Sequence, residues 1–144
     1  MRTLLTGFAL ATTVGLFPAA GSASSLPSWV RVETITVDGV ANAIPGGATI
    51  HRVYAGGTYR FSLDPTSPGI SYSGGRPPEI SSFLMIIDKS TTQNSTQTVG
   101  LSEDVGPTYT IETSGAGFSL DAFVADIYIG DNSGSTRIFV DQWK

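Results

Sequence analysis

The chain contains no cysteine and a single histidine, His51, among its 144 residues. The lack of cysteine excludes disulfide bonds, thiolate metal sites and thiol nucleophiles. One histidine cannot supply the two or three imidazole ligands of a typical zinc site. No serine lies in the Gly-x-Ser-x-Gly pattern of a nucleophile elbow. We therefore expect His51 to be a half-exposed strand residue and the protein not to be an enzyme.

Positive charge is also scarce. The chain has 8 basic and 12 acidic residues, which give a formal net charge of −4, and Lys89 and Lys144 are the two lysines. Nucleic acids and anionic membranes are recognised by clustered basic residues, and this sequence has no basic cluster. We therefore expect no nucleic-acid partner.

Long apolar runs are absent beyond the first two dozen residues. That segment begins with Arg2, continues with an apolar stretch from residue 4 to residue 17, and ends after Pro18 in small residues up to Ala23. This order is typical of a secretory signal peptide. The stretch is shorter than the about 20 apolar residues of a membrane-spanning helix. We expect a signal peptide over residues 1–23, with cleavage after Gly21 or Ser25 as alternatives.

The expected mature chain, residues 24–144, is then secreted or periplasmic and has no membrane span. Its length suits one domain with a real hydrophobic core. Since it has no cysteine, that core must hold the domain without disulfides. Disulfide-free secretion favours a bacterial source.

Short runs of β-branched and aromatic residues, separated by glycine- and serine-rich turns, fill the rest of the sequence. Such spacing is typical of strands, and no segment shows a sustained helical period. The run at 83–87 is apolar on both faces and predicts a central strand covered on both sides. Loops are expected over 64–78 and 88–97. The expected strands are 29–37, 50–54, 58–63, 83–87, 99–101, 108–112, 123–129 and 136–143.

These strands predict an all-β fold, a single antiparallel β-sandwich of jelly-roll or immunoglobulin-like type with about seven to nine short strands. In the strand at 58–63, Tyr59, Phe61 and Leu63 share one face while polar residues share the other. This alternation indicates sheets with one wet face. An eight-stranded barrel is the alternative.

Three segments carry a resemblance to a known family: GTYRFSL at 57–63, FLMIID at 83–88 and PTYTI at 107–111. They resemble strands of bacterial pre-peptidase C-terminal domains, over less than half of the chain. The resemblance implies a secreted β-sandwich accessory module. Where that family has an acidic start to its central strand, this chain has Ser81 and Ser82, and no site residue is carried over.

Calcium is the metal whose ligands the sequence offers. Asp131 and Asn132 lie in an oxygen-rich turn, and Asp126 lies close by in sequence. Calcium takes oxygen ligands from such residues. The same residues are typical of the turn of a hairpin. We favour the turn and keep calcium as the alternative; no other cofactor is expected.

Aromatic residues give the main binding hypothesis, because a rigid aromatic face can stack on a sugar ring. The candidates are Trp29, Tyr72, Tyr128 and Trp143. We expect a secreted, non-enzymatic binding module for a carbohydrate or another surface polymer. The alternative is a structural or self-assembling extracellular protein that associates through its edge strands. A small hydrolase ranks third.

Overall fold

A computed structural model describes residues 26–72, 77–89, 95–126 and 128–144. Within these residues the regular elements are ten strands and one 3₁₀ turn. The elements are β1 (Trp29–Asp38), β2 (Ala43–Ile44), β3 (Ile50–Tyr54), β4 (Gly57–Leu63), β5 (Gly69–Ser71), β6 (Ser81–Asp88), β7 (Ser95–Ser102), β8 (Thr108–Thr113), β9 (Phe118–Ala125), η1 (Ile129–Asp131) and β10 (Ser133–Trp143).

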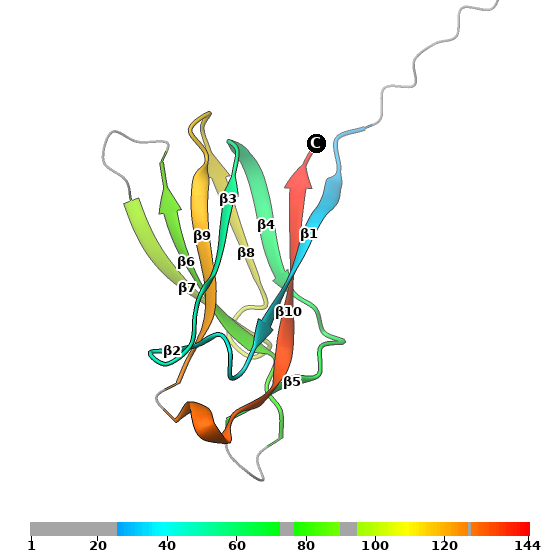
Figure 1. The fold of residues 1–144 in the computed structure, drawn as a ribbon. Helices are drawn as coiled ribbons and strands as arrows, with labels where there is room; N and C mark the ends of the chain where they lie inside the picture. The colour runs from blue at the N-terminus through cyan, green and yellow to red at the C-terminus, as the bar shows by residue number, and fades with distance from the viewer. Residues whose placement is uncertain (1–25, 73–76, 90–94, 127) are drawn as a thin grey trace, which may run out of the picture.

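The strands form two five-stranded sheets packed face to face (Figure 1). Sheet 1 has the order β1-β10-β4-β8, with β5 also paired to β10. Sheet 2 has the order β2-β9-β6-β7, with β3 also paired to β9. All these pairs are antiparallel except β2–β9. The predicted β-sandwich is confirmed, and the described strands do not close into the alternative barrel.

The core lies between the sheets and is built from the alternating apolar residues of the long strands. Tyr59, Phe61 and Leu63 of β4 are buried, as their alternation predicts. Leu84 and Ile86 of β6 are fully buried on the facing sheet. Phe118 of β9 packs edge to face on Tyr59 across the core, with ring centroids 5.3 Å apart. Aromatic packing thus joins the two sheets of this disulfide-free chain.

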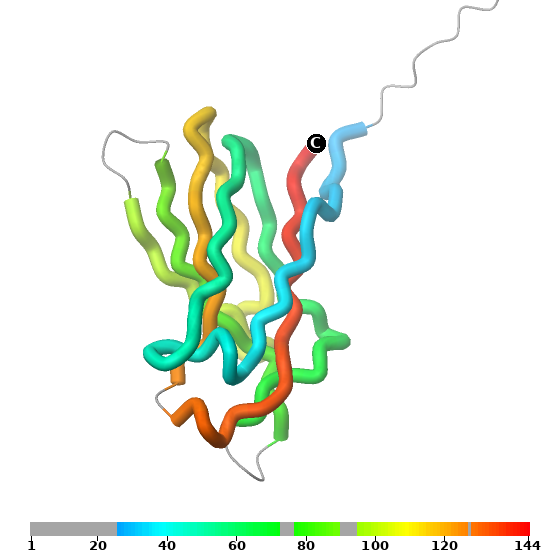
Figure 2. Tube along the Cα trace, viewed as in Figure 1, coloured from blue at the N-terminus to red at the C-terminus, as the bar shows by residue number. Residues whose placement is uncertain are grey.

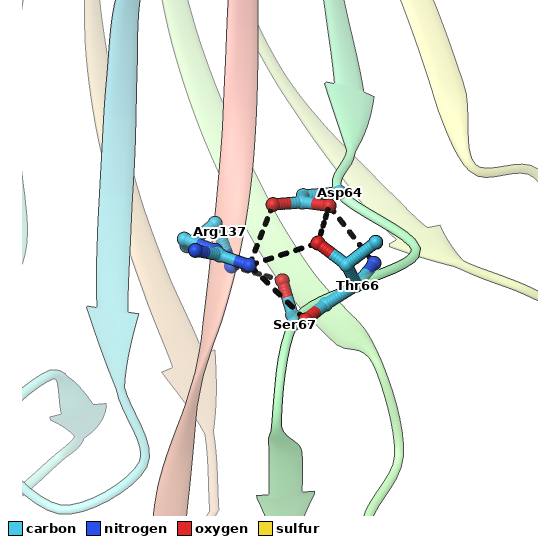
Figure 3. Close-up of polar contacts among 4 residues, drawn as sticks. All are labelled: Asp64, Thr66, Ser67 and Arg137. Atoms are coloured by element: carbon cyan, nitrogen blue, oxygen red, sulfur yellow. Dashed lines mark hydrogen bonds and ion pairs between the residues drawn. The ribbon is translucent and has the colours of Figure 1, made fainter.

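The expected loop at 64–78 contains a strand, β5, that the sequence analysis missed. Its central residue, Ile70, is fully buried. The turn before β5 is fixed by the buried carboxylate of Asp64 (Figure 3). That carboxylate accepts hydrogen bonds from the Thr66 amide and hydroxyl at 2.8 and 2.7 Å. It also forms an ion pair with Arg137, with an N–O distance of 2.8 Å. The loop prediction was wrong because a three-residue strand flanked by prolines has no visible period.

Two predictions in sheet 2 need correction. β7 spans Ser95–Ser102, so the expected loop at 88–97 is shorter and the edge strand longer than predicted. β6 is a central strand, paired to β7 and β9, but only one of its faces is covered. Leu84 and Ile86 are fully buried, whereas Phe83 on the other face is 37% exposed. No described element forms a layer over that outer face.

The hairpin turn expected at Asp131 and Asn132 is instead part of a crossing between the sheets. β9 starts at Phe118, five residues before the predicted strand, and ends at Ala125. The chain then passes through η1 and enters β10 at Ser133. Since β9 belongs to sheet 2 and β10 to sheet 1, the two strands do not pair. Ile127, within the predicted strand, lies outside the described residues.

The two ends of the described chain meet at one end of sheet 1 (Figure 2). The Ser28 amide donates to the Lys144 carbonyl at 2.7 Å. The expected signal peptide, residues 1–23, lies outside the described residues. Within the part of the chain that the structure describes, no helix has the length and hydrophobicity to cross a bilayer.

Candidate functional site

A hollow of about 470 Å³ opens on the outer side of sheet 2. Strands β6 and β7, the end of β9, and the segments after β5 and β7 contribute its lining. We call it the Phe83 hollow, after the ring at its floor. Its main lining residues are Tyr72, Glu79, Ser81, Phe83, Ser102 and Val105.

The floor of the Phe83 hollow is an aromatic surface held in place by strand register. Phe83 lies opposite Phe123 of β9 and opposite Gly100 of β7. The two rings stack with centroids 5.9 Å apart and planes 17° apart. A Cβ atom at position 100 would lie 3.4 Å from the Phe83 ring. The glycine therefore leaves the β7 side of the ring uncovered, while Phe123 fixes its orientation.

One wall of the hollow is Tyr72, which an antiparallel bridge positions. Ile70 and Glu79 exchange backbone hydrogen bonds of 2.8 and 2.9 Å, which brings the segment after β5 beside the start of β6. The hydroxyls of Tyr72 and Ser81 then lie 2.8 Å apart. Burial raises the pKa of Tyr72, and the charges of Glu79 and Asp126 raise it further, although the hydrogen bond with Ser81 lowers it. The phenol is therefore a neutral hydroxyl that can donate to or accept from a ligand.

The rim combines exposed apolar surface with acidic side chains. Val105 is 90% exposed, and its amide donates to the Ser102 hydroxyl at 3.0 Å. Glu79 lines both the Phe83 hollow and a smaller one of about 110 Å³, to which Glu103 and Asp104 also contribute. A ligand at this rim therefore meets an aromatic floor, hydroxyl groups and negative charge.

The four predicted aromatic residues do not form one site. Tyr72 lines the Phe83 hollow. Trp29 and Trp143 pair across β1 and β10 of sheet 1, with their rings edge to face at 5.3 Å, and Arg60 lies 4.6 Å from the Trp29 ring. Tyr128 is 72% exposed and is not among the residues that line the hollow.

Two of the three candidate calcium ligands, Asp126 and Asn132, form hydrogen bonds within the fold. Asp126 accepts a hydrogen bond from the Tyr128 amide at 2.9 Å. The Asn132 side-chain amide is buried and donates to the Gly39 carbonyl at 2.8 Å. Asp131 belongs to η1. Among the described residues, no three acidic, histidine or cysteine side chains are grouped so as to hold a metal ion.

His51 lies on β3 with an exposed side chain, in agreement with the prediction. Its Nδ1 atom lies 3.0 Å from a carboxylate oxygen of Asp121, which also accepts a 3.0 Å hydrogen bond from Thr49. The carboxylate thus orients the imidazole. His51 does not line the Phe83 hollow.

Sequence reasoning missed Phe83, Glu79, Gly100 and Val105 as site residues. Phe83 was assigned to a strand covered on both sides. Gly100 carried a usable signal, because an isolated glycine within a strand often marks a place where another group approaches closely. Glu79 and Val105 carried none, since exposed turn residues of both types are common.

Comparisons with known proteins give a partial likeness. No family model and no solved structure matches the chain. The chain is similar to Multiple epidermal growth factor-like domains protein 8 of human, at 36% identity, and of mouse, at 35% identity, each over 75 residues. The match covers 49% of this chain and 3% of those proteins, so the chain spans a small fraction of their length.

The name of these relatives refers to epidermal growth factor-like domains. Modules of that type are dense in disulfides, whereas this chain has no cysteine. The relatives named are mammalian, so they give no support to the expectation of a bacterial source.

Proposed function

We propose that the chain is a secreted, non-enzymatic module that binds a carbohydrate in the Phe83 hollow. The observation that carries the proposal is the Phe83 ring, 37% exposed on the floor of a hollow and fixed by stacking on Phe123. Sugar rings present apolar faces that pack on such rings. Their hydroxyl groups suit the few convergent polar groups of a small-ligand site, supplied here by Tyr72, Ser81 and Glu79.

A binding role is favoured over hydrolysis by the chemistry of the lining. Glycoside hydrolases generally use two carboxyl groups held on opposite sides of the scissile bond. Among the described residues that line the Phe83 hollow, Glu79 is the one acid. The hydroxyls of Tyr72 and Ser81 bond to each other, and no histidine lies beside them to activate either as a nucleophile.

A panel of oligosaccharides, followed by calorimetry on the strongest ligand, tests this proposal. Phe83→Ala removes the stacking surface from an outer face, so the core stays intact. We expect at least a tenfold loss of affinity, about 1.4 kcal/mol. Gly100→Val, which fills the hollow beside the ring, should weaken binding as well.

Trp143→Ala is the matched control, because it deletes a partly exposed aromatic ring from the other sheet. This variant should bind as the parent does. The proposal fails if no oligosaccharide binds, or if Trp143→Ala loses affinity while Phe83→Ala retains it.

Self-association is a second candidate function, favoured by the edge strand β7. Edge strands usually carry charges, proline or bulges that prevent pairing with another chain. β1 has a bulge between Arg31 and Glu33, β8 carries Glu112 and β3 carries Arg52. The eight residues of β7, STQTVGLS, include no charge and no proline. Antiparallel pairing of two β7 strands would therefore meet no repulsion.

Sedimentation velocity over a wide range of protein concentration tests this candidate. We expect a dimer that Thr98→Lys dissociates, because two lysines would then face each other across the new strand pair. Thr110→Lys, at an exposed position of β8, is the control and should leave the dimer intact. A parent protein that stays monomeric at the highest concentration removes this candidate.

A further inference from the structure

We infer that the Phe83 hollow selects a carbohydrate that carries a free, protonated amine, an inference that rests on the proposed function. Its basis is the combination of exposed aromatic surface and acidic side chains around one hollow whose described lining holds no basic residue. An ammonium group is the ligand feature that both of these recognise.

The negative charge comes from two segments of the chain. Glu79 lines the Phe83 hollow and, with Glu103 and Asp104, the smaller hollow that shares Ser81 and Ser102 with it. Asp126 follows Ala125, a lining residue at the end of β9.

No described basic group neutralises this charge. No lysine, arginine or histidine among the described residues lines either hollow. The arginine ion pairs of the structure serve other carboxylates, those of Glu33, Asp64 and Asp141. Within the described part of the chain, the acidic rim thus has no cationic partner, so its charge favours a cationic ligand over an anionic sugar.

The aromatic floor and wall add to the same preference. Phe83 and Tyr72 both line the hollow, and the face of an aromatic ring attracts a cation within about 6 Å of its centre. An amine held between these rings and the Glu79 carboxylate would interact favourably with both. A neutral sugar in the same place gains the stacking but not the charge interaction.

The inference is tested with three β-1,4-linked trisaccharides: the glucosamine trimer, its N-acetylated form and the glucose trimer. At one position of each sugar they carry an amine, an acetylated amine or a hydroxyl group. The protein should bind the glucosamine trimer at least tenfold more tightly than either neutral trimer at low salt. Added salt should reduce this difference, because it screens exposed charges.

Glu79→Gln should lower the affinity for the glucosamine trimer several-fold more than the affinity for the neutral trimers, because the amide keeps a hydrogen-bonding group and loses the charge. Glu112→Gln, an exposed acid on β8 of sheet 1, is the matched control and should change none of the three. Equal affinity for all three trimers would overturn the inference while leaving the proposed function in place. If neither these three trimers nor any other oligosaccharide of a broad panel binds, both the inference and the proposed function are wrong.

Discussion

At the scale of the residue, the outer face of sheet 1 is organised by one buried carboxylate. Asp141 is 4% exposed and accepts hydrogen bonds from Arg31 and, at 2.9 Å, from Arg60. The Arg31 guanidinium lies 3.5 Å from the centre of the Phe139 ring. Burial tends to raise the pKa of Asp141, but the hydrogen bonds and charges of Arg31 and Arg60 hold it below its ordinary value. The arginines and rings of this face thus have a structural role.

Asp141→Asn should therefore destabilise the protein by about 2–3 kcal/mol at neutral pH, because two guanidinium groups lose their shared anion. Urea unfolding of the variant and the parent measures the difference. Asp131→Asn, at an exposed acid of η1, should change stability little.

The same pair of proteins gives a pH dependence with a defined sign. A carboxyl group with a lowered pKa in the folded state stabilises the protein above its unfolded pKa of about 3.9, and this contribution is lost as the pH falls through the folded value. The stability difference between the parent and Asp141→Asn should thus be largest near neutral pH and shrink below pH 4. A difference that stays constant down to pH 2 would contradict the assigned role of the charge.

At the scale of the element, the short strand β5 depends on a close approach to β10. Gly134 has φ of +88°, and a Cβ atom there would lie 2.3 Å from the Gly69 carbonyl oxygen. Only glycine fits such a backbone without strain. The pairing matters to the core because β5 carries the fully buried Ile70.

Gly134→Ala should lower the free energy of unfolding by about 1–3 kcal/mol, through backbone strain and loss of the β5–β10 pairing. Gly130→Ala is the matched control, since a Cβ atom at Gly130 meets nothing within 4 Å. Chemical denaturation of the two variants compares them directly. Equal stability would show that β5 tolerates a shift away from β10.

Elements were predictable where local alternation specifies them. The buried face of β4 follows from Tyr59, Phe61 and Leu63, and β10 was located to within a few residues. β5 escaped prediction because three residues show no period. The crossing from β9 to β10 escaped because Asp131 and Asn132 suit any tight turn. A turn can connect two strands of one sheet or of two different sheets. The outcome depends on how the strands pair across the molecule, and the residue types of the turn do not specify that pairing.

At the scale of the whole molecule, the chain has no disulfide, and the packing of two sheets around one hydrophobic core stabilises its fold. The pocket could not be derived from sequence, because its residues come from distant segments. Tyr72 was among the four aromatic candidates of the sequence. Phe83 was not, since its exposure depends on which face of β6 turns away from sheet 1. The signal peptide over residues 1–23 stays a prediction that the mass of the secreted protein can test.

The most direct test of the central claim is a two-dimensional amide NMR titration with the oligosaccharide that binds most tightly. Carbohydrate binding in the Phe83 hollow predicts chemical-shift changes concentrated at the residues of that hollow, above all Phe83, Gly100 and Ser102. Changes concentrated at Trp29 and Trp143 on sheet 1, or no changes with any oligosaccharide, would contradict it.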